Sequence, residues 1–207
     1  MPERAGDELR VDVVDASDWG DVVRLFGDRG AAAGCWCMWW RVARHGQEWQ
    51  RAKGRTNRDR LRRGIRGGSV HAVLARAGDE PVGWCSFGPR ESFPRIDAMR
   101  SLPADAPPGT WTIVCFFVAR EWRRRGVSRR LVEAATAAAF ERGAERVEAF
   151  PVDPERTSAS GAGDAWTGYL SLFEDLGYER AGDGGAARTV VVTERPPARR
   201  AARARRK

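Results

Sequence analysis

The sequence lacks the features of a membrane-spanning or exported protein. It has no run of about eighteen apolar residues, so no transmembrane helix is predicted. Met1 to Arg10 mixes acids and bases and does not form the apolar segment of a signal peptide, so we expect a cytoplasmic protein. Only four cysteines occur among 207 residues, and without an export signal they are expected to be reduced thiols.

Histidine is scarce as well, since only His45 and His71 are present. A structural zinc site needs four ligands, and the Cys35-x-Cys37 spacing differs from the usual Cys-x-x-Cys knuckle. We therefore expect no metal. The phosphate-binding pattern Gly-x-x-x-x-Gly-Lys-Ser/Thr is also missing, which argues against a P-loop nucleotide site.

The positive charge of the chain lies mostly at its end. The formal net charge is +8, and seven basic residues with no acid follow Glu194. We predict a single domain over residues 1–194 and a disordered basic tail over residues 195–207. A nucleic-acid partner could bind through this tail, but the charge pattern does not favour one for the domain itself.

The centre of the sequence combines a strand, a basic turn and a helix. Thr112 to Val118 is apolar and rich in β-branched and aromatic residues, which predicts a buried strand. A helix is predicted from about Val127, because apolar residues recur there at helical spacing: Leu131, Val132, Ala135, Ala138 and Ala139. The first amides of a helix lack internal partners, and Gly126 and the small Ser128 let an anion approach them. This stretch predicts a pyrophosphate site.

The spacing Arg123-x-x-Gly126-x-Ser128 resembles the acyl-CoA signature of the GNAT acetyltransferase superfamily, Gln/Arg-x-x-Gly-x-Gly/Ala. Ser128 departs only mildly from the small residue at the last position. The strand pattern of Arg146 to Val152 and the Gly177-Tyr178 pair after a late helix also fit, and the likeness covers roughly residues 8 to 194. It implies an α/β (α+β) fold: a mixed central β-sheet, splayed at its middle, with helices on both faces.

The resemblance implies an acetyl-CoA-dependent N-acetyltransferase, with acetyl-CoA as co-substrate. The acceptor would be a primary amine of a small molecule or peptide, which attacks the thioester directly. The backbones of Phe116, Phe117 and Val118 would pair with the pantetheine arm. The pyrophosphate would be held by the residues of the turn and the first helical turn: Arg123, Arg124, Arg125, Gly126, Val127, Ser128 and Arg129.

The family's usual proton donor for the leaving thiolate is a tyrosine, but this sequence has Phe173 at that position. Tyr169 and Ser171 are the candidate replacements, and the thiolate could also leave unassisted. For the base that deprotonates the amine, Glu148 and Asp153 are the candidates. Phe173 keeps a second hypothesis open, namely an acyl-CoA-binding module without turnover.

Another candidate group is the thiol of Cys115, which could carry the acetyl group covalently, although burial would leave it inert. A third hypothesis is an acetyltransferase acting on a nucleic-acid-linked acceptor. A homodimer is also possible, because tryptophans are numerous and an exposed cluster would favour one.

The acceptor pocket is predicted from two segments. Gly34 to Val42 contains four large apolar residues that either pack in the core or face a cleft. On the second interpretation, Trp36, Cys37 and Trp40 bind substrate. In the family, the loop corresponding to residues 90–109 borders the acceptor, which makes Arg90, Glu91 and Arg95 binding candidates.

The remaining patterns predict the other elements of the domain. They indicate, in chain order, a strand over residues 9–14, a helix with Trp19 and Phe26 on one face, and a surface helix over 48–66. A hairpin over 70–76 and 82–87, a flexible loop over 156–164, an apolar helical stripe from Trp166 to Leu176 and a strand over 188–193 follow.

Overall fold

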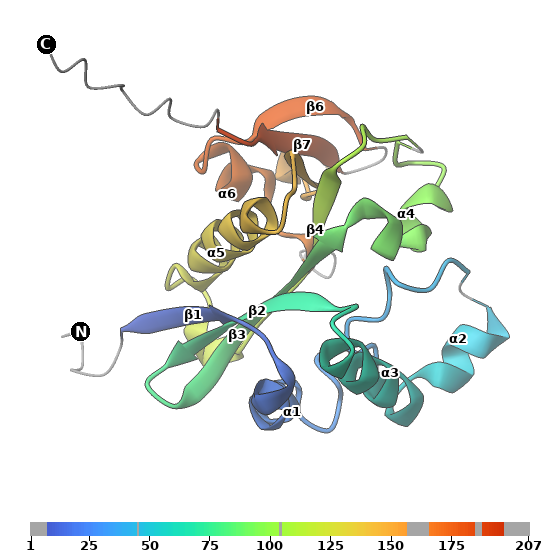
Figure 1. Ribbon diagram of the computed structural model, residues 1–207, viewed down its shortest axis with the longest axis vertical. Coiled ribbons are helices and arrows are strands. Elements are labelled where there is room, and N and C mark those ends of the chain that lie inside the picture. The colour runs from blue at the N-terminus through green and yellow to red at the C-terminus, as the bar shows by residue number, and fades with distance from the viewer. Residues whose placement is uncertain (1–7, 45, 104, 157–165, 185–187, 197–207) are drawn as a thin grey trace, which may run out of the picture.

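A computed structural model describes residues 8–44, 46–103, 105–156, 166–184 and 188–196. Seven strands form one mixed sheet in the order β1-β2-β3-β4-β5-β7-β6 (Figure 1). In chain order they are β1 (Leu9–Val13), β2 (His71–Ala77), β3 (Glu80–Pro89), β4 (Thr110–Val118), β5 (Arg146–Ala149), β6 (Glu179–Asp183) and β7 (Thr189–Glu194). Only β4 and β5 pair in parallel, and all other neighbours are antiparallel.

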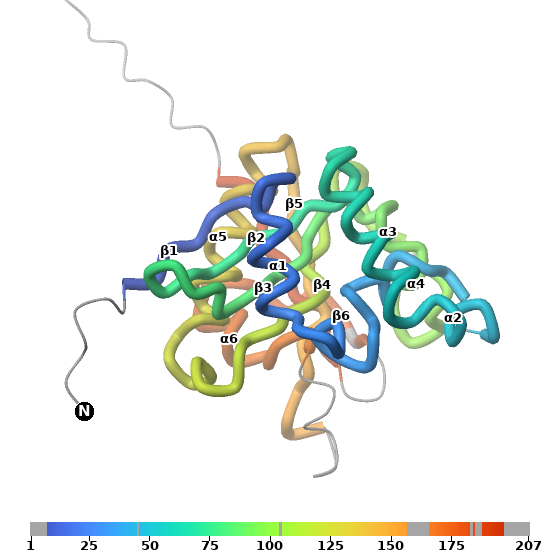
Figure 2. Tube along the Cα trace, turned by 90° about the horizontal axis from the view of Figure 1, so that it is seen from below, coloured from blue at the N-terminus to red at the C-terminus, as the bar shows by residue number. Residues whose placement is uncertain are grey.

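Helices cover both faces of this sheet. They are α1 (Trp19–Phe26), α2 (Gln47–Ala52), α3 (Arg55–Arg66), α4 (Pro94–Asp97), α5 (Val127–Glu141) and α6 (Leu170–Glu174). Figures 1 and 2 show α5 and α6 on one side, with α1, α2 and α3 on the other. Each side has its own apolar cluster. The expected architecture of a mixed sheet with helices on both faces is therefore confirmed.

The sheet parts between β4 and β5. Their parallel register covers only residues 110–113 and 146–149. Beyond this point β4 stays paired with β3, whereas the chain after β5 forms a bridge from Val152 to Tyr169. The register of β3 and β4 also shifts by one residue between Ser86 and Phe87, which leaves Val114 as a β-bulge. The two strands separate along the second half of β4, as the resemblance implied.

Helix α5 lies close to the sheet because its contact face is built from small and β-branched residues. Its buried positions recur at helical spacing: Val127, Leu131, Val132, Ala135, Ala138 and Ala139. Opposite the first turn, β3 carries Gly83. A Cβ at this position would lie 2.6 Å from Val127 Cγ1 and 3.1 Å from Leu131 Cδ1. The missing side chain therefore sets how closely the N-terminus of α5 approaches the sheet.

Two predicted helices differ from the structure. The surface helix expected over 48–66 is two helices, because Lys53 is extended and Gly54 has a φ of 79°. The apolar stripe from Trp166 to Leu176 is α-helical only in α6, because Gly168 has a φ of 79° and Tyr169 is extended and bridged to Val152. Backbone hydrogen bonds to the neighbouring segment override the helical periodicity there.

Some expectations fall partly outside the described residues. The expectations for His45, for most of the 156–164 loop and for tail residues 197–207 concern residues outside the described part of the chain. Arg195, the first residue of the predicted tail, is described: its Nε donates to the carbonyl of Ala144 at 2.8 Å, and its amide to that of Glu145 at 2.8 Å. Within the described chain, no helix is long and apolar enough to cross a bilayer.

The close approach at Gly83 can be tested by Gly83→Ala. The added methyl collides with a stiff, β-branched side chain, so we expect the free energy of unfolding to fall by about 1–3 kcal/mol in urea titrations. Gly20→Ala in α1 is the matched control, since a Cβ there meets nothing within 4 Å. That variant should be neutral or more stable by up to about 1 kcal/mol. Equal stability of the two variants would contradict the packing argument.

Candidate active site

The turn before α5 presents unused backbone donors. Gly126 is the N-cap of α5 with a φ of 78°, and no side chain caps the helix. Within the described chain, no backbone carbonyl accepts a hydrogen bond from the amides of Arg124 to Arg129. A Cβ on Gly126 would meet nothing within 4 Å, so the space above the turn is open. These amides lie at the positive end of the helix dipole and can bind an anion.

Some arginines of this turn are held by protein groups and others are not. Arg123 Nε donates to the carbonyl of Val118 at 3.1 Å, which ties the turn to the end of β4. Arg129 pairs with Asp175 at 3.1 Å, and the guanidinium of Arg125 lies 5.1 Å from the Trp122 ring centroid. Arg124 is exposed, and its backbone has a φ of 61°. The structure thus brings all the predicted pyrophosphate residues to one basic turn.

The second half of β4 leads from the sheet to this turn. Its edge toward β5 has no strand partner after Ile113 within the described residues. Phe116 packs edge-on against Phe173, and Phe117 packs against Phe26 on the opposite face. Phe117 and Val118 are only partly buried. An extended chain could therefore pair with this edge and end at the amides of the turn.

The candidate proton donors differ in exposure. Tyr169 is 42% exposed and Ser171 is also exposed, whereas Phe173 is fully buried. A Cβ built on Gly168 would lie 3.0 Å from the Phe173 ring and 3.6 Å from the Phe116 ring. Gly168 therefore packs against Phe116 of β4, and Tyr169 is the next residue in the chain. The other tyrosine, Tyr178, is buried, and burial raises the pKa of its phenol.

Glu148 and Arg90 form a buried ion pair on the face covered by α1 and α3. Arg90 Nη1 donates to Glu148 Oε1 at 2.7 Å, and the hydroxyl of Thr112 donates to the same oxygen at 2.8 Å. Arg90 Nη2 also donates to Asp97 at 3.1 Å and to the carbonyl of Pro103 at 2.6 Å. The sequence singled out the pair residues separately but did not indicate that they meet. Protein groups engage both, so we interpret the pair as a support for the cleft.

Asp153, the other candidate base, is also buried. Its Oδ1 accepts a hydrogen bond from the amide of Glu155 at 3.1 Å. Among the residues of the 90–109 loop, Glu91 is exposed, and Arg95 donates to the carbonyl of Ala43 at 3.3 Å.

The segment from Gly34 to Val42 packs inward. Trp36, Cys37 and Trp40 are 1–4% exposed. Trp36 lies 6.0 Å from Trp19 between ring centroids, and Trp40 stacks on Trp166 at 5.5 Å. These three side chains therefore pack in the core, and their proposed contact with an acceptor stays a prediction.

One thiol of this segment, that of Cys37, contacts a second buried thiol. Its Sγ lies 3.2 Å from the Sγ of Cys115, which is on β4. Burial raises the pKa of the Cys37 thiol, and a neutral thiol is a poor nucleophile. Among the described residues, no three His, Cys, Asp or Glu side chains form a group able to hold a metal ion.

A strand edge that opens beside a second strand and ends at an uncapped helix N-terminus can bind an extended ligand that carries a phosphate or pyrophosphate group. The sequence model of the acetyltransferase (GNAT) family matches residues 36–161. The chain therefore belongs to this family, and the resemblance of the Arg123 to Ser128 turn is confirmed. A search among curated proteins found no significant match.

Solved structures share the fold at low sequence identity. PaiA N-acetyltransferase from Thermoplasma acidophilum, in complex with coenzyme A, is 11% identical over 91% of this chain and 99% of that chain, with a TM-score of 0.52. The ribosomal-protein-alanine N-acetyltransferase from Brucella melitensis is 15% identical over 90% and 98%, with a TM-score of 0.52. A putative acetyltransferase from Salmonella typhimurium, solved with acetyl-CoA, is 13% identical over 90% and 93%, with a TM-score of 0.51.

The structural role of the buried pair can be tested by Arg90→Met. Removing one partner leaves an uncompensated carboxylate at Glu148, and we expect the free energy of unfolding to fall by about 3 kcal/mol or more. Adding Glu148→Leu should recover part of that loss. Arg180→Met, which breaks the exposed pair with Glu174, is the control and should change little. Urea titrations measure all three, and an equal cost for Arg90→Met and Arg180→Met would refute the assignment.

Proposed function

We propose that the chain is an acetyl-CoA-dependent N-acetyltransferase that modifies a primary amine of a small molecule or peptide. The observation that carries this proposal is the continuity of the open β4 edge with the unused amides from Arg124 to Arg129. One ligand with an extended arm that leads into a diphosphate matches both features. The coenzyme A and acetyl-CoA complexes of the similar structures support the choice of ligand.

Acetyl-CoA would supply the activated acetyl group as a thioester. The amides at the start of α5, together with Arg124 and Arg125, would hold its pyrophosphate. The backbone of Phe116 to Val118 would orient the pantetheine arm, and an amide of this edge would polarise the thioester carbonyl. These residues act by positioning, which brings the thioester into the gap between β4 and β5.

Two proton transfers complete the reaction. An amine must lose a proton before it attacks, and Asp153 would accept it through water. The other candidate base, Glu148, is engaged by Arg90 and Thr112. The leaving thiolate would take a proton from Tyr169 or Ser171. Because a thiol has a pKa of about 8.5, it could also leave as the free anion. Cys115 would not be needed, since the amine attacks the thioester directly.

A second candidate function is an acyl-CoA-binding module without turnover. The buried Phe173 favours it, because its ring occupies the position of the family's usual acid and cannot donate a proton. Release of free thiol from acetyl-CoA, scored against a panel of amines, separates the two functions. Amine-dependent release excludes the module.

Gly126→Glu tests the cofactor half of the proposal. The new carboxylate occupies the open space above the turn and repels a diphosphate, so calorimetry should show acetyl-CoA affinity falling by at least about a hundredfold. Gly143→Glu is the matched control, because Gly143 has a φ of 96°, also faces open space and follows the other end of α5. If both variants bound acetyl-CoA equally well, the pyrophosphate would not lie at this turn.

Tyr169→Phe tests the proton donor. If the phenol protonates the thiolate, kcat should fall by about a hundredfold while the KM for acetyl-CoA stays the same. Ser171→Ala is the companion variant and should keep its activity. The reverse pattern would assign the donor to Ser171, and full activity of both variants would mean that the thiolate leaves unassisted.

A further inference from the structure

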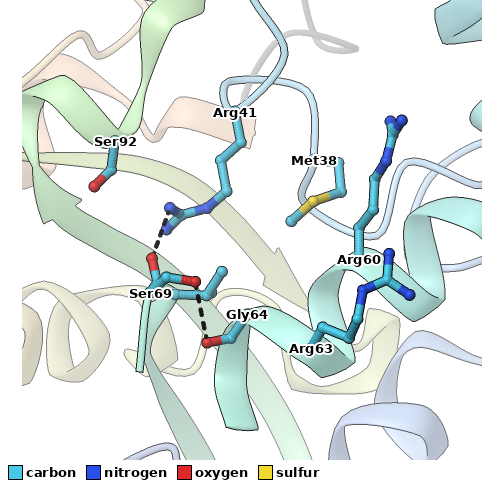
Figure 3. Close-up of a pocket in the computed structure, with 8 residues that line it drawn as sticks. Met38, Arg41, Arg60, Arg63, Gly64, Ser69 and Ser92 are labelled. Carbon is cyan, nitrogen blue, oxygen red and sulfur yellow. Dashed lines mark hydrogen bonds between the residues drawn. The ribbon is translucent and has the colours of Figure 1, made fainter. Parts of the chain in front are cut away.

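A second basic pocket lies on the face of the sheet covered by α1 and α3. It has a volume of about 460 Å³ and is lined by side chains from four segments (Figure 3). Arg41 comes from the chain before α2, Arg60 and Arg63 from α3, and Ser69 from the turn before β2. Ser92, which precedes α4, adds a further hydroxyl, and none of the described residues that line the pocket is acidic.

Arg41 is partly buried and, unlike the two buried arginines of the described chain, lacks a carboxylate partner there. Arg76 pairs with three aspartates, and Arg90 pairs with Glu148 and Asp97. Arg41 contacts no carboxylate in the part of the chain that the structure describes. Its hydrogen bonds to the Ser69 carbonyl and the Ser86 hydroxyl are both long, at 3.4 Å, and its buried Nε has no partner.

The surroundings of Arg41 make this charge costly unless an anion is bound. Its guanidinium lies 4.6 Å from the Phe93 ring centroid, and burial lowers its pKa to about 10. The titratable groups that interact with it electrostatically are the thiols of Cys37 and Cys115 and the imidazole of His71. A desolvated guanidinium without a counter-charge is unfavourable, and a bound oxyanion would supply that charge.

The other side chains add to this preference. Arg60 meets Glu48 only at 3.5 Å, and the Glu48 side chain is 87% exposed. Arg63 is exposed on the same helix, and Ser69 is positioned by its bond to the Gly64 carbonyl at 3.4 Å. Figure 3 shows the guanidinium of Arg41 directed toward Ser69. The lining supplies three guanidinium groups and two hydroxyls, which is more than one planar carboxylate can use and suits a phosphate dianion. In Figure 3 the guanidinium groups of Arg60 and Arg63 point away from that of Arg41, and the exposed Arg63 side chain would turn toward a bound anion.

We propose that this pocket binds the phosphate group of a small phosphorylated molecule, through Arg41, Arg63 and Ser69 with support from Arg60 and Ser92. The volume leaves room for an organic group beside the phosphate. Ser86, which Arg41 contacts, is the register partner of Cys115 on β4. The ligand therefore lies on the same face as Glu148, away from α5. This site is separate from the pyrophosphate turn and does not depend on acetyl-CoA binding.

Calorimetry with inorganic phosphate, without acetyl-CoA and at ionic strength held constant with chloride, tests the proposal. The pyrophosphate turn is disabled by Gly126→Glu in every protein, so that only the second pocket is measured. We expect this parent to bind phosphate, and Arg41→Met and Arg63→Gln each to weaken binding about tenfold or more. Arg63 is exposed, so its replacement should leave the fold intact even if Arg41→Met does not.

Arg66→Gln is the matched control, because it removes the same charge from an exposed position of α3 outside the pocket. It should bind phosphate as the parent does. The proposal is overturned if the parent does not bind phosphate, or if Arg63→Gln leaves binding unchanged. An equal loss with Arg66→Gln would instead indicate binding to the general charge of α3, as for a nucleic-acid backbone. Succinate binding as tightly as phosphate would replace the phosphate assignment with a carboxylate one.

Discussion

The parting of β4 from β5 is the constraint on which the rest of the site depends. Backbone amides and carbonyls need hydrogen-bond partners. After the short parallel register ends, the β5 side finds partners in another segment, whereas the β4 side keeps unpaired backbone groups. On the β5 side, Val152 donates to the carbonyl of Gly168 and accepts from the amide of Leu170. On the β4 side, the bulge at Val114 and the turn beyond Val118 leave an open edge. The same parting creates the gap and the unpaired backbone that lines it.

Three arginines that are shielded from water differ in how their positive charge is compensated. Arg76 and Arg90 are neutralised by carboxylates that arrive from distant parts of the chain, and each thereby joins elements of the domain. Arg41 is partly buried beside the Phe93 ring and near the thiols of Cys37 and Cys115 instead. Desolvation is unfavourable for all three, so the difference lies in the compensation. Two of these charges serve the structure, and the third is suited to a ligand.

Local patterns predicted the centre of the molecule well. The apolar run before the turn, the glycine at 126 and the small-residue stripe of α5 are each readable within a few residues. The break at Gly54 and the extended backbone at Tyr169 were not, because neighbouring segments decide them. β6 was also missed, since Glu179–Asp183 has little apolar pattern and is a strand because β7 pairs with it.

The sequence by itself determined the class of the protein, through a strand, a glycine turn and a helix whose properties are local. The tertiary structure decided which side chains meet. Arg90 and Glu148 lie 58 residues apart, and Cys37 and Cys115 lie 78 apart. Their contacts depend on strand register and on the bulge at Val114. Such contacts arise from the packing of whole elements, and no short stretch of sequence encodes them.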